Sequence, residues 1–393
     1  MTETQVAIVG GGFSGLYAAH LMRRRGVDSF VIEARDRLGG RILTVDETGE
    51  AGEDGFDLGP SWCWPQLQPA VGEAIADLDL ALFRQYDEGD VIFEPTGREA
   101  PQRSPGFSEA RQTMRLVGGS AALVRRLARD VPRDRQLLST CLIAMELTET
   151  GIDLTITQSD GSSRRLRAQY VIAALPPRLI EATISFSPQQ DRRAAARWRN
   201  TPTWMAPHAK FFALYDRPFW REAGLSGIAQ SMAGPMAEIY DATTSSGKAA
   251  LFGFLGIPAE RRAAIGEEAL TRACLDQLAH IFGSAAKAAR KTLLKDWAAD
   301  KFTATAADRN ASAHIVPFSG PWVLAPWDQR LELAGSETSP SDPGYLAGAV
   351  VAARRAVNAT LARLEVKRGR SHLSVSTDLS RTEGRRAQRS SEA

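Results

Sequence analysis

The sequence predicts an α/β protein. Three observations indicate this class. Residues 6–40 alternate apolar strand, glycine turn, helical pattern and strand, an order typical of a parallel sheet with crossover helices. Later apolar runs of strand length are separated by turns and by a helical pair at residues 258–282. A long alanine-rich helical pattern at residues 345–364 closes the patterned part of the chain.

The first apolar strand, residues 6–9, runs into glycines at positions 10, 12 and 15. Gly10 permits a tight turn, Gly12 lets a pyrophosphate approach the backbone, and Gly15 lets the next helix pack closely. The start of that helix offers free N–H groups to phosphate. After the next strand, Glu33 is placed to accept hydrogen bonds from ribose hydroxyls, which argues against the 2′-phosphate of NADP. The segment therefore predicts a dinucleotide-binding site.

A second glycine pair follows the acid. Arg35, Gly39, Gly40 and Arg41 belong to the run RDRLGGR. This run resembles the segment that FAD oxidoreductases of the amine oxidase and glutathione reductase-like superfamily carry after their ribose acid. The resemblance implies FAD, rather than NAD, as the cofactor.

Composition describes an ordinary globular protein. Of 393 residues, 44% are hydrophobic and 24% charged, and the formal net charge is +2, so no nucleic-acid surface is expected. Cys63, Cys141 and Cys274 are far apart and predict neither a metal site nor a disulfide framework. We expect no bound metal.

The two ends of the sequence bear on location. The first strand begins at Val6, which leaves no room for a signal peptide, and no run approaches the roughly 18 apolar residues of a membrane span. We therefore expect a cytoplasmic protein without membrane association. Residues 366–393 are rich in Ser and Arg and predict a disordered basic tail, with an electrostatic contact tail as the alternative.

Between the ends, apolar runs predict the remaining elements. A hairpin is expected around residues 94–97. The other expected strands lie at residues 29–32, 137–143, 152–157, 170–175, 210–215, 241–255, 293–297 and 331–335, and the other expected helices at residues 16–25, 65–82 and 121–130.

Four separated segments resemble the flavin monoamine oxidase and polyamine oxidase family. They are residues 6–41, VIAALPP at 171–177, KFFALYDRPFWR at 210–221 and LAGSETSPSDPGYLAGAVVAARRAV at 333–357. The resemblance implies a Rossmann-like FAD-binding domain interleaved with a substrate domain that is built on a mixed sheet plus helices. The expected FAD-binding domain comprises residues 1–78, 112–196 and 297–365, and the substrate domain comprises residues 79–111 and 197–296.

The resemblance also assigns roles by position. Lys210 corresponds to the active-site lysine that holds a water against flavin N5, where a cation favours reduced flavin and its reaction with oxygen. Tyr345 corresponds to an aromatic residue before the flavin face that orients the amine. Gly335 and Glu337 match the segment that reaches the ribityl and pyrophosphate portion of the flavin.

The substrate pocket is less defined. Trp62 and Trp64 are candidate pocket residues, with core packing as the alternative. The second aromatic of the family is missing from residues 304–308. Trp322 is our third pocket candidate, and Phe302, Phe318 or Trp327 could serve in its place. The cysteine that some members bond to flavin is also missing there, so the FAD is expected to be non-covalent. The segment 82–116 is shorter than in typical members, which implies a pocket that is more open or is completed by a partner.

The resemblance implies an FAD-dependent amine oxidase. Hydride would pass from the α-carbon of a primary or secondary amine to flavin N5, the imine would hydrolyse, and O2 or another acceptor would reoxidise the flavin, giving H2O2 when it is O2. An L-amino acid oxidase is one alternative, although Trp62 stands where those enzymes place a carboxylate-binding arginine; Arg103, Arg111 or Arg115 could substitute. A non-catalytic flavin-binding accessory protein is another. A homodimer is left open.

Overall fold

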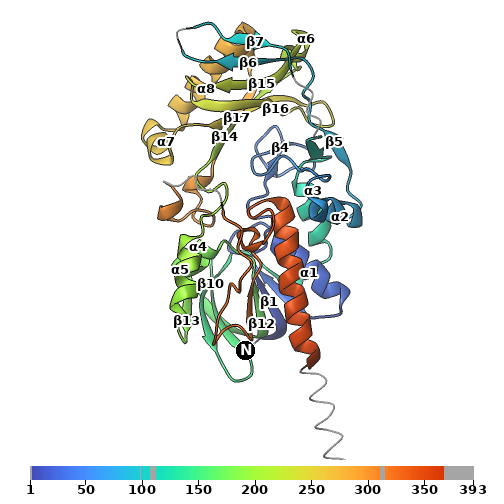
Figure 1. The fold of residues 1–393 in the computed structure, drawn as a ribbon, viewed down its shortest axis with the longest axis vertical. Helices are drawn as coiled ribbons and strands as arrows, with labels where there is room; N and C mark the ends of the chain where they lie inside the picture. Colours follow the sequence, from blue (N-terminus) through green and yellow to red (C-terminus); the bar gives the residue numbers. More distant parts are fainter. Residues whose placement is uncertain (1, 98, 107–111, 310–314, 367–393) are drawn as a thin grey trace, which may run out of the picture.

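The computed structural model describes residues 2–97, 99–106, 112–309 and 315–366. The molecule is elongated, and each half is built on its own large sheet (Figure 1). The chain passes between the halves several times, so both are assembled from separated segments. Of the predicted tail, all but Val366 lies outside the described residues.

The first half holds an eight-stranded sheet. Its strands run in the order β13-β10-β11-β12-β1-β2-β9, and β19 also pairs with β12. The pairs among β12, β1, β2, β9 and β19 are parallel, whereas β10, β11 and β12 pair antiparallel. The strands are β1 (Thr2–Val9), β2 (Ser29–Ile32), β9 (Gln136–Leu137), β10 (Thr140–Leu147), β11 (Ile152–Gln158), β12 (Ser163–Ala173), β13 (Ser185–Ser187) and β19 (Leu331–Leu333).

Helices cover both faces of this sheet (Figure 1), which explains the unbroken apolar run of β1. Val6 and Ile8 pack with α1, α3 and the final helix, whereas Ala7 and Val9 belong to the core under α4 and α5. The helices of this half are α1 (Phe13–Arg24), α2 (Pro69–Asp77), α3 (Ala121–Ala128), α4 (Pro177–Thr183), α5 (Arg192–Asn200) and the final helix at residues 346–366.

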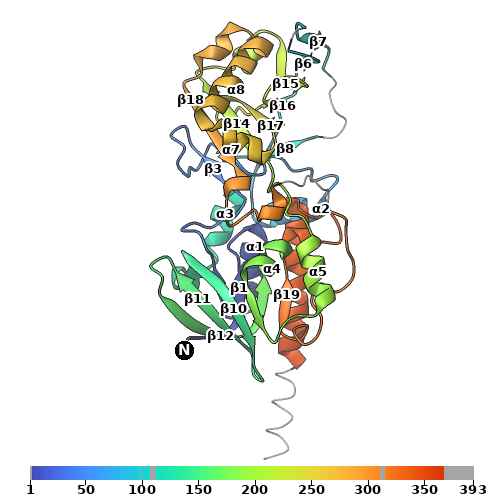
Figure 2. The same cartoon turned by 90° about the vertical axis from the view of Figure 1, so that its left-hand side faces the viewer.

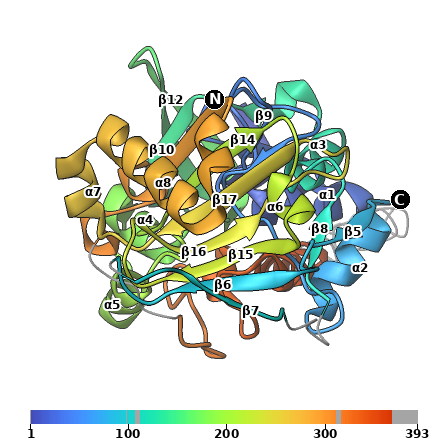
Figure 3. The same ribbon diagram turned by 90° about the horizontal axis from the view of Figure 1, so that it is seen from above.

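The second half holds a seven-stranded mixed sheet in the order β18-β14-β17-β16-β15-β6-β7. Only β15 and β6 pair parallel. Helices α7 and α8 lie on its outer side (Figures 2 and 3). The elements are β6 (Asp90–Glu94), β7 (Gln102–Ser104), β14 (Ala209–Tyr215), β15 (Leu225–Ser231), β16 (Met236–Asp241), β17 (Ala249–Leu255), β18 (Lys291–Asp296), α6 (Phe219–Glu222), α7 (Ala259–Ile265) and α8 (Glu267–Phe282).

Strand β14 connects the two halves. Its alternation sends Phe211 and Ala213 into the core under α8, and sends Phe212 and Leu214 to the opposite face. That opposite face packs against Phe56 and other residues of the first half. Since Lys210 has the parity of Phe212, its side chain points toward the first half as well.

Short ladders and single turns complete the chain. The expected hairpin is present as the antiparallel pair β6–β7, and the helix expected at residues 65–82 begins only at Pro69 of α2. The small elements are β3 (Thr44–Val45), β4 (Phe56–Asp57), β5 (Leu82–Arg84), β8 (Met114–Leu116), η1 (Arg133–Arg135), η2 (Ser284–Ala288), η3 (Trp297–Ala299), η4 (Ala306–Asp308) and η5 (Ser336–Thr338).

The predicted fold class is thereby confirmed: an α/β unit with a parallel central sheet and a second unit with a mixed sheet. The exact domain boundaries stay a prediction. Within the described ranges, none of the helices has the length and apolar character that a membrane crossing needs. In the same ranges, no three His, Cys, Asp or Glu side chains are grouped so as to hold a metal.

Candidate active site

The predicted glycine turn joins β1 to α1. Gly10 has a φ of +102°, and a Cβ there would lie 2.6 Å from the Ala174 carbonyl oxygen, so only glycine fits. A Cβ on Gly15 would lie 1.9 Å from the Gly10 carbonyl oxygen, which explains the close approach of helix to turn. A Cβ on Gly12, in contrast, would meet no atom nearer than 3.9 Å. The backbone at Gly12 therefore faces open space at the start of α1, as a phosphate cradle requires.

Glu33 and the second glycine pair close the turn from the other side. The buried Glu33 carboxylate accepts hydrogen bonds from the backbone N–H of Gly11 at 2.7 Å and of Arg35 at 2.8 Å. Gly39 and Gly40 have φ of +107° and +57°, and the Gly39 N–H donates to the Gly11 carbonyl at 2.8 Å. Both glycine motifs of the sequence thus meet in one loop pair.

Two arginines tie this region to distant segments. Arg35 donates from Nη2 to Asp300 at 2.6 Å and to Thr303 at 2.9 Å. Arg41 donates to both carboxylate oxygens of Glu337, at 2.6 Å from Nη1 and 3.2 Å from Nη2. Burial alone would raise the pKa of Asp300, but the nearby cations, Arg35 first, lower it.

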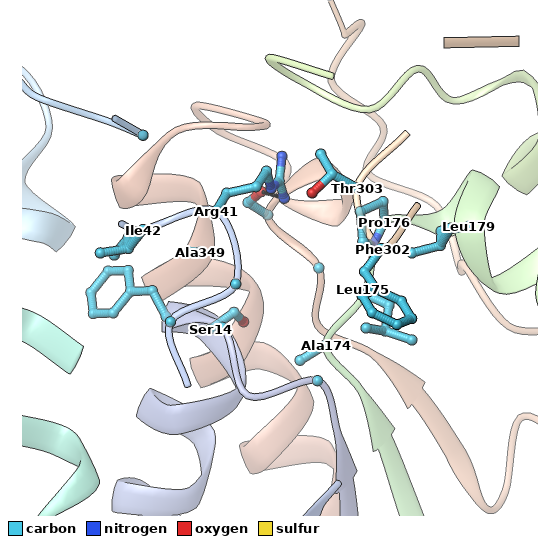
Figure 4. Close-up of a pocket in the computed structure, with 18 of the residues that line it drawn as sticks. Ser14, Arg41, Ile42, Ala174, Leu175, Pro176, Leu179, Phe302, Thr303 and Ala349 are labelled. Atoms are coloured by element: carbon cyan, nitrogen blue, oxygen red, sulfur yellow. Dashed lines mark hydrogen bonds between the residues drawn. The ribbon is translucent and has the colours of Figure 1, made fainter. Parts of the chain in front are cut away.

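These groups open into one cavity of about 640 Å³. Figure 4 shows its nucleotide part, with Ser14, Arg41, Ile42 and Ala349 on one side and Leu175, Pro176, Leu179 and Phe302 on the other. The volume lies within the range of about 300–1,000 Å³ that is usual for ligand and cofactor sites. The predicted residues that line the cavity are Gly10, Gly12, Glu33, Arg35, Gly39, Gly40, Arg41, Trp62, Trp64, Lys210, Gly335 and Tyr345.

Lys210 is buried at the far end of the cavity, with 1% of its surface exposed. Its Nζ donates to the Gly59 carbonyl at 2.6 Å, to the Ser61 hydroxyl at 2.8 Å and to the Asp57 carbonyl at 3.2 Å. It also lies over the ring of Phe254, 5.1 Å from the centroid. Burial lowers the pKa of Lys210 to about 7, and the Asp57 charge only partly opposes that effect.

The backbone that Lys210 contacts is held at three consecutive carbonyls. Lys210 binds those of Asp57 and Gly59, and the Trp297 indole N–H donates to that of Leu58 at 2.9 Å. Lys210 lies on β14 of the second half, and Trp297 directly follows β18 of that half. The three carbonyls belong to the first half. The loop that carries Ser61 and Trp62 into the cavity is therefore positioned by the opposite sheet.

Aromatic rings surround the rest of this end. Tyr345 lies 6.4 Å from Trp64 and 5.4 Å from Trp204 between ring centroids. Trp62 lies 6.2 Å from Phe254. Tyr345 is 37% exposed, so the aromatic cluster stands at an opening of the cavity. Sequence reasoning missed Trp204, which lies in an irregular segment between α5 and β14 without any periodic signal.

Three predicted residues do not line the cavity. Gly15 lies outside the cavity lining, where its lack of a side chain lets α1 pack closely against the turn at Gly10. Glu337 is buried behind the wall and contacts Arg41 instead. Trp322 packs in the core under α4 and α5, with its ring 5.4 Å from Phe318, so the placement expected for it in the pocket is not found. Of the alternatives to Trp322, only Phe302 lines the cavity, and it does so near Arg35 at the nucleotide end.

The arginines considered as carboxylate ligands lie elsewhere. Arg115 is buried and donates to the carbonyls of Ala242 and Thr243, and Arg103 pairs with Asp90 on the surface. Neither lines the cavity. Arg111 lies outside the described residues.

The fold and the cavity define a dinucleotide-binding protein. The chain belongs to the family described as flavin containing amine oxidoreductase, whose family model matches residues 99–361. The model for an NAD(P)-binding Rossmann-like domain matches residues 8–78. The protein is thus a flavin-dependent oxidoreductase of the amine oxidase family, with FAD as its cofactor.

Individual relatives agree with this family. A probable flavin-containing monoamine oxidase A of Dictyostelium discoideum is 24% identical, over 89% of this chain and 95% of its own length. Amine oxidase [flavin-containing] B of Sus scrofa is 24% identical, over 92% and 86%. Among solved structures, cyclohexylamine oxidase from Brevibacterium oxydans aligns with a TM-score of 0.76 at 22% identity, over 92% of this chain and 99% of that one. A putrescine oxidase triple mutant aligns with a TM-score of 0.75 at 21% identity, over 92% and 99%.

Proposed function

We propose that FAD binds along the cavity without a covalent bond. The glycine turn and the first N–H groups of α1 would hold the pyrophosphate, because α1 has no side-chain cap and no acid in its first turn. Glu33 lies beside the turn, where it would accept the ribose hydroxyls. Gly335 and Ser336 complete the wall that Arg41 reaches from the other side.

We propose further that the protein oxidises amines at the aromatic end. The bound flavin would supply the hydride acceptor for the amine α-carbon and, through O2, the route to H2O2, while the released imine would hydrolyse. Tyr345, Trp64 and Trp204 would orient the amine through their electron-rich faces. Lys210 would place a positive charge, when protonated, beside the reacting ring.

The side chains that line the aromatic end are the basis for the substrate class that we propose. Besides Lys210, the cavity-lining residues there are mainly aromatic, namely Trp62, Trp64, Trp204, Phe254, Trp297 and Tyr345. Within the described residues, the only carboxylate that lines the cavity is Glu33, at the nucleotide end. A distal ammonium group would find no counter-ion there, so we propose a hydrophobic primary or secondary monoamine rather than a diamine.

An amino acid substrate is less favoured. One relative, the L-amino acid dehydrogenase of Synechocystis, is 26% identical over 63% of this chain. An amino acid requires a cation for its carboxylate, but Arg41 is paired with Glu337 and Arg35 with Asp300. Lys210 already has three hydrogen-bond partners within the protein.

An anaerobic substrate panel tests this function. The purified holoprotein would be mixed with aralkyl and alicyclic monoamines, with diamines and with L-amino acids, and bleaching of the flavin absorbance would be followed. Bleaching by monoamines is expected. Preferential bleaching by amino acids or diamines would contradict the proposed substrate class, and no bleaching by any of them would favour a non-catalytic flavoprotein. The predicted domain boundaries, the cytoplasmic location and a homodimer stay predictions.

A further inference from the structure

Ser61 lies beside Lys210 in the wall of the cavity. Both residues line the cavity, and Ser61 is 8% exposed. Its Oγ lies 2.8 Å from Lys210 Nζ and 3.4 Å from the Asp57 carbonyl oxygen. The other two partners of Nζ are backbone carbonyls, which have no proton to transfer. Of the three groups that Lys210 contacts, only the Ser61 hydroxyl can both give and accept a proton.

The reaction creates a need for such a group. An alkylamine reaches the protein mostly as an ammonium ion, because its pKa is near that of a lysine side chain, about 10. Hydride loss from the α-carbon requires a free lone pair on nitrogen, so one proton must leave first. No carboxylate lines the aromatic end within the described residues. The buried Lys210 is the nearest candidate to receive the proton.

We infer that Ser61 is a proton-relay residue for the substrate amine. The ammonium nitrogen gives a proton to Ser61 Oγ, and Ser61 gives its own hydroxyl proton to the neutral amine of Lys210. One N–H bond breaks on the substrate and one forms on Lys210, the serine is regenerated, and the total charge of the site does not change. This inference rests on the proposed amine oxidation.

The charges around Lys210 favour a neutral form that can accept the proton. From β4, the Asp57 charge raises the pKa of Lys210, whereas Arg115 of β8 and, above all, burial lower it. Lys295, its register partner on β18, pairs with Asp300 at 3.2 Å. Strand β17 presents the uncharged rings of Phe252 and Phe254. Just before the strand of Lys210, burial lowers the pKa of His208, which keeps that neighbour uncharged at neutral pH.

The test compares Ser61→Ala with Ser61→Thr, which keeps a hydroxyl. Ser226→Ala serves as the matched control, since Ser226 is a buried serine of β15 whose hydroxyl bonds to the Asp90 carbonyl. The rate of anaerobic flavin reduction would be measured from pH 6 to 10.5 with a simple monoamine and with its less basic β-fluorinated analogue. FAD content and amine affinity would be measured beside it.

Wild-type, Ser61→Thr and Ser226→Ala proteins should share an acid limb near neutral pH that does not follow the basicity of the amine. Ser61→Ala should react only with amine that arrives neutral, so it should be slower than the wild-type protein below the pKa of the free amine and equal to it above pH 10. Its acid limb should move with the pKa of the substituted amine.

Four results would overturn the relay. An unchanged pH profile in Ser61→Ala, or an equal loss at every pH, would leave Ser61 with no role or a packing role only. Loss of FAD from Ser61→Ala would assign the residue to cofactor binding. If the wild-type protein were reduced by no amine at any pH, the proposed function would fail and the relay with it. The results for Ser61→Ala would overturn the relay alone, because the wild-type protein would still oxidise the amine.

Discussion

The Arg41 guanidinium and the Glu337 carboxylate form a bidentate ion pair between residues 296 positions apart in the sequence. Glu337 has no exposed side-chain surface, and its Oε1 also accepts from the backbone N–H of Trp204 at 3.3 Å. The pair fixes the second glycine segment against the loop after β19. Its geometry implies that Glu337 acts on the cofactor site through Arg41.

Replacing Glu337 with Gln should therefore destabilise the protein and weaken its hold on FAD. Removing one partner of a buried pair typically costs about 3–5 kcal/mol, because the other charge stays uncompensated. Chemical denaturation and an FAD titration would measure both effects. Asp90→Asn is the matched control, since Asp90 pairs with Arg103 on the surface, where such pairs contribute about 0–1 kcal/mol. Equal effects of the two variants would contradict a special role for Glu337.

Replacing Glu33 with Gln should raise the FAD dissociation constant by roughly tenfold, because hydrogen bonds to a charged acceptor contribute about 1.5–3 kcal/mol. The carboxylate accepts from two backbone N–H groups of the turn, so the variant loses charge both for the ribose and for the turn. Flavin fluorescence titration of the apoprotein would measure the change. Unaltered affinity would show that Glu33 supports the turn alone.

Replacing Lys210 with Met should slow reoxidation of the reduced enzyme by O2, by roughly a hundredfold, and leave FAD bound. Stopped-flow mixing of reduced protein with oxygenated buffer gives this rate directly. Lys291→Met, on the exposed surface of β18, is the control. If Lys210→Met instead lost its flavin, the lysine would be a structural clamp for residues 57–61.

The stability of the protein should rise with pH between about 7 and 10. Burial lowers the pKa of Lys210 to about 7 in the folded protein, whereas the unfolded chain keeps a lysine near 10.5. The unfolded chain binds the extra proton between these values, so the free energy of unfolding increases there by about 1.4 kcal/mol per pH unit. Urea unfolding at several pH values would measure the slope, and Lys210→Met should lack that contribution.

Trp204 and Tyr345 should act together on the amine. Each substitution to Ala should lower kcat/KM for a hydrophobic monoamine, and Tyr345→Phe should keep most of the activity because the ring is retained. The rings lie 5.4 Å apart, so a double-mutant cycle should give a coupling of about 0.5–1.5 kcal/mol. Strict additivity would contradict a shared aromatic surface.

The local sequence pattern was enough to predict the nucleotide end of the cavity. The spacing of glycines and of Glu33 reflects backbone geometry that is set within residues 6–40, and β2 begins and ends where the apolar run predicted. The aromatic end depends on contacts between distant segments. Trp204 reaches the aromatic end from an irregular segment of the chain. Trp322 does not reach it, because Trp322 packs in the core under α4 and α5. No periodicity in the sequence encodes either placement.

The carbonyls of Asp57 and Gly59 are bound by Lys210 of the second half, and the carbonyl of Leu58 is bound by Trp297, which directly follows β18 of that half. A hinge motion between the halves would have to break these bonds together and leave buried carbonyl groups without donors. We therefore expect amine entry to depend on side-chain movement at the exposed aromatic rim, with the two sheets remaining one rigid frame throughout turnover.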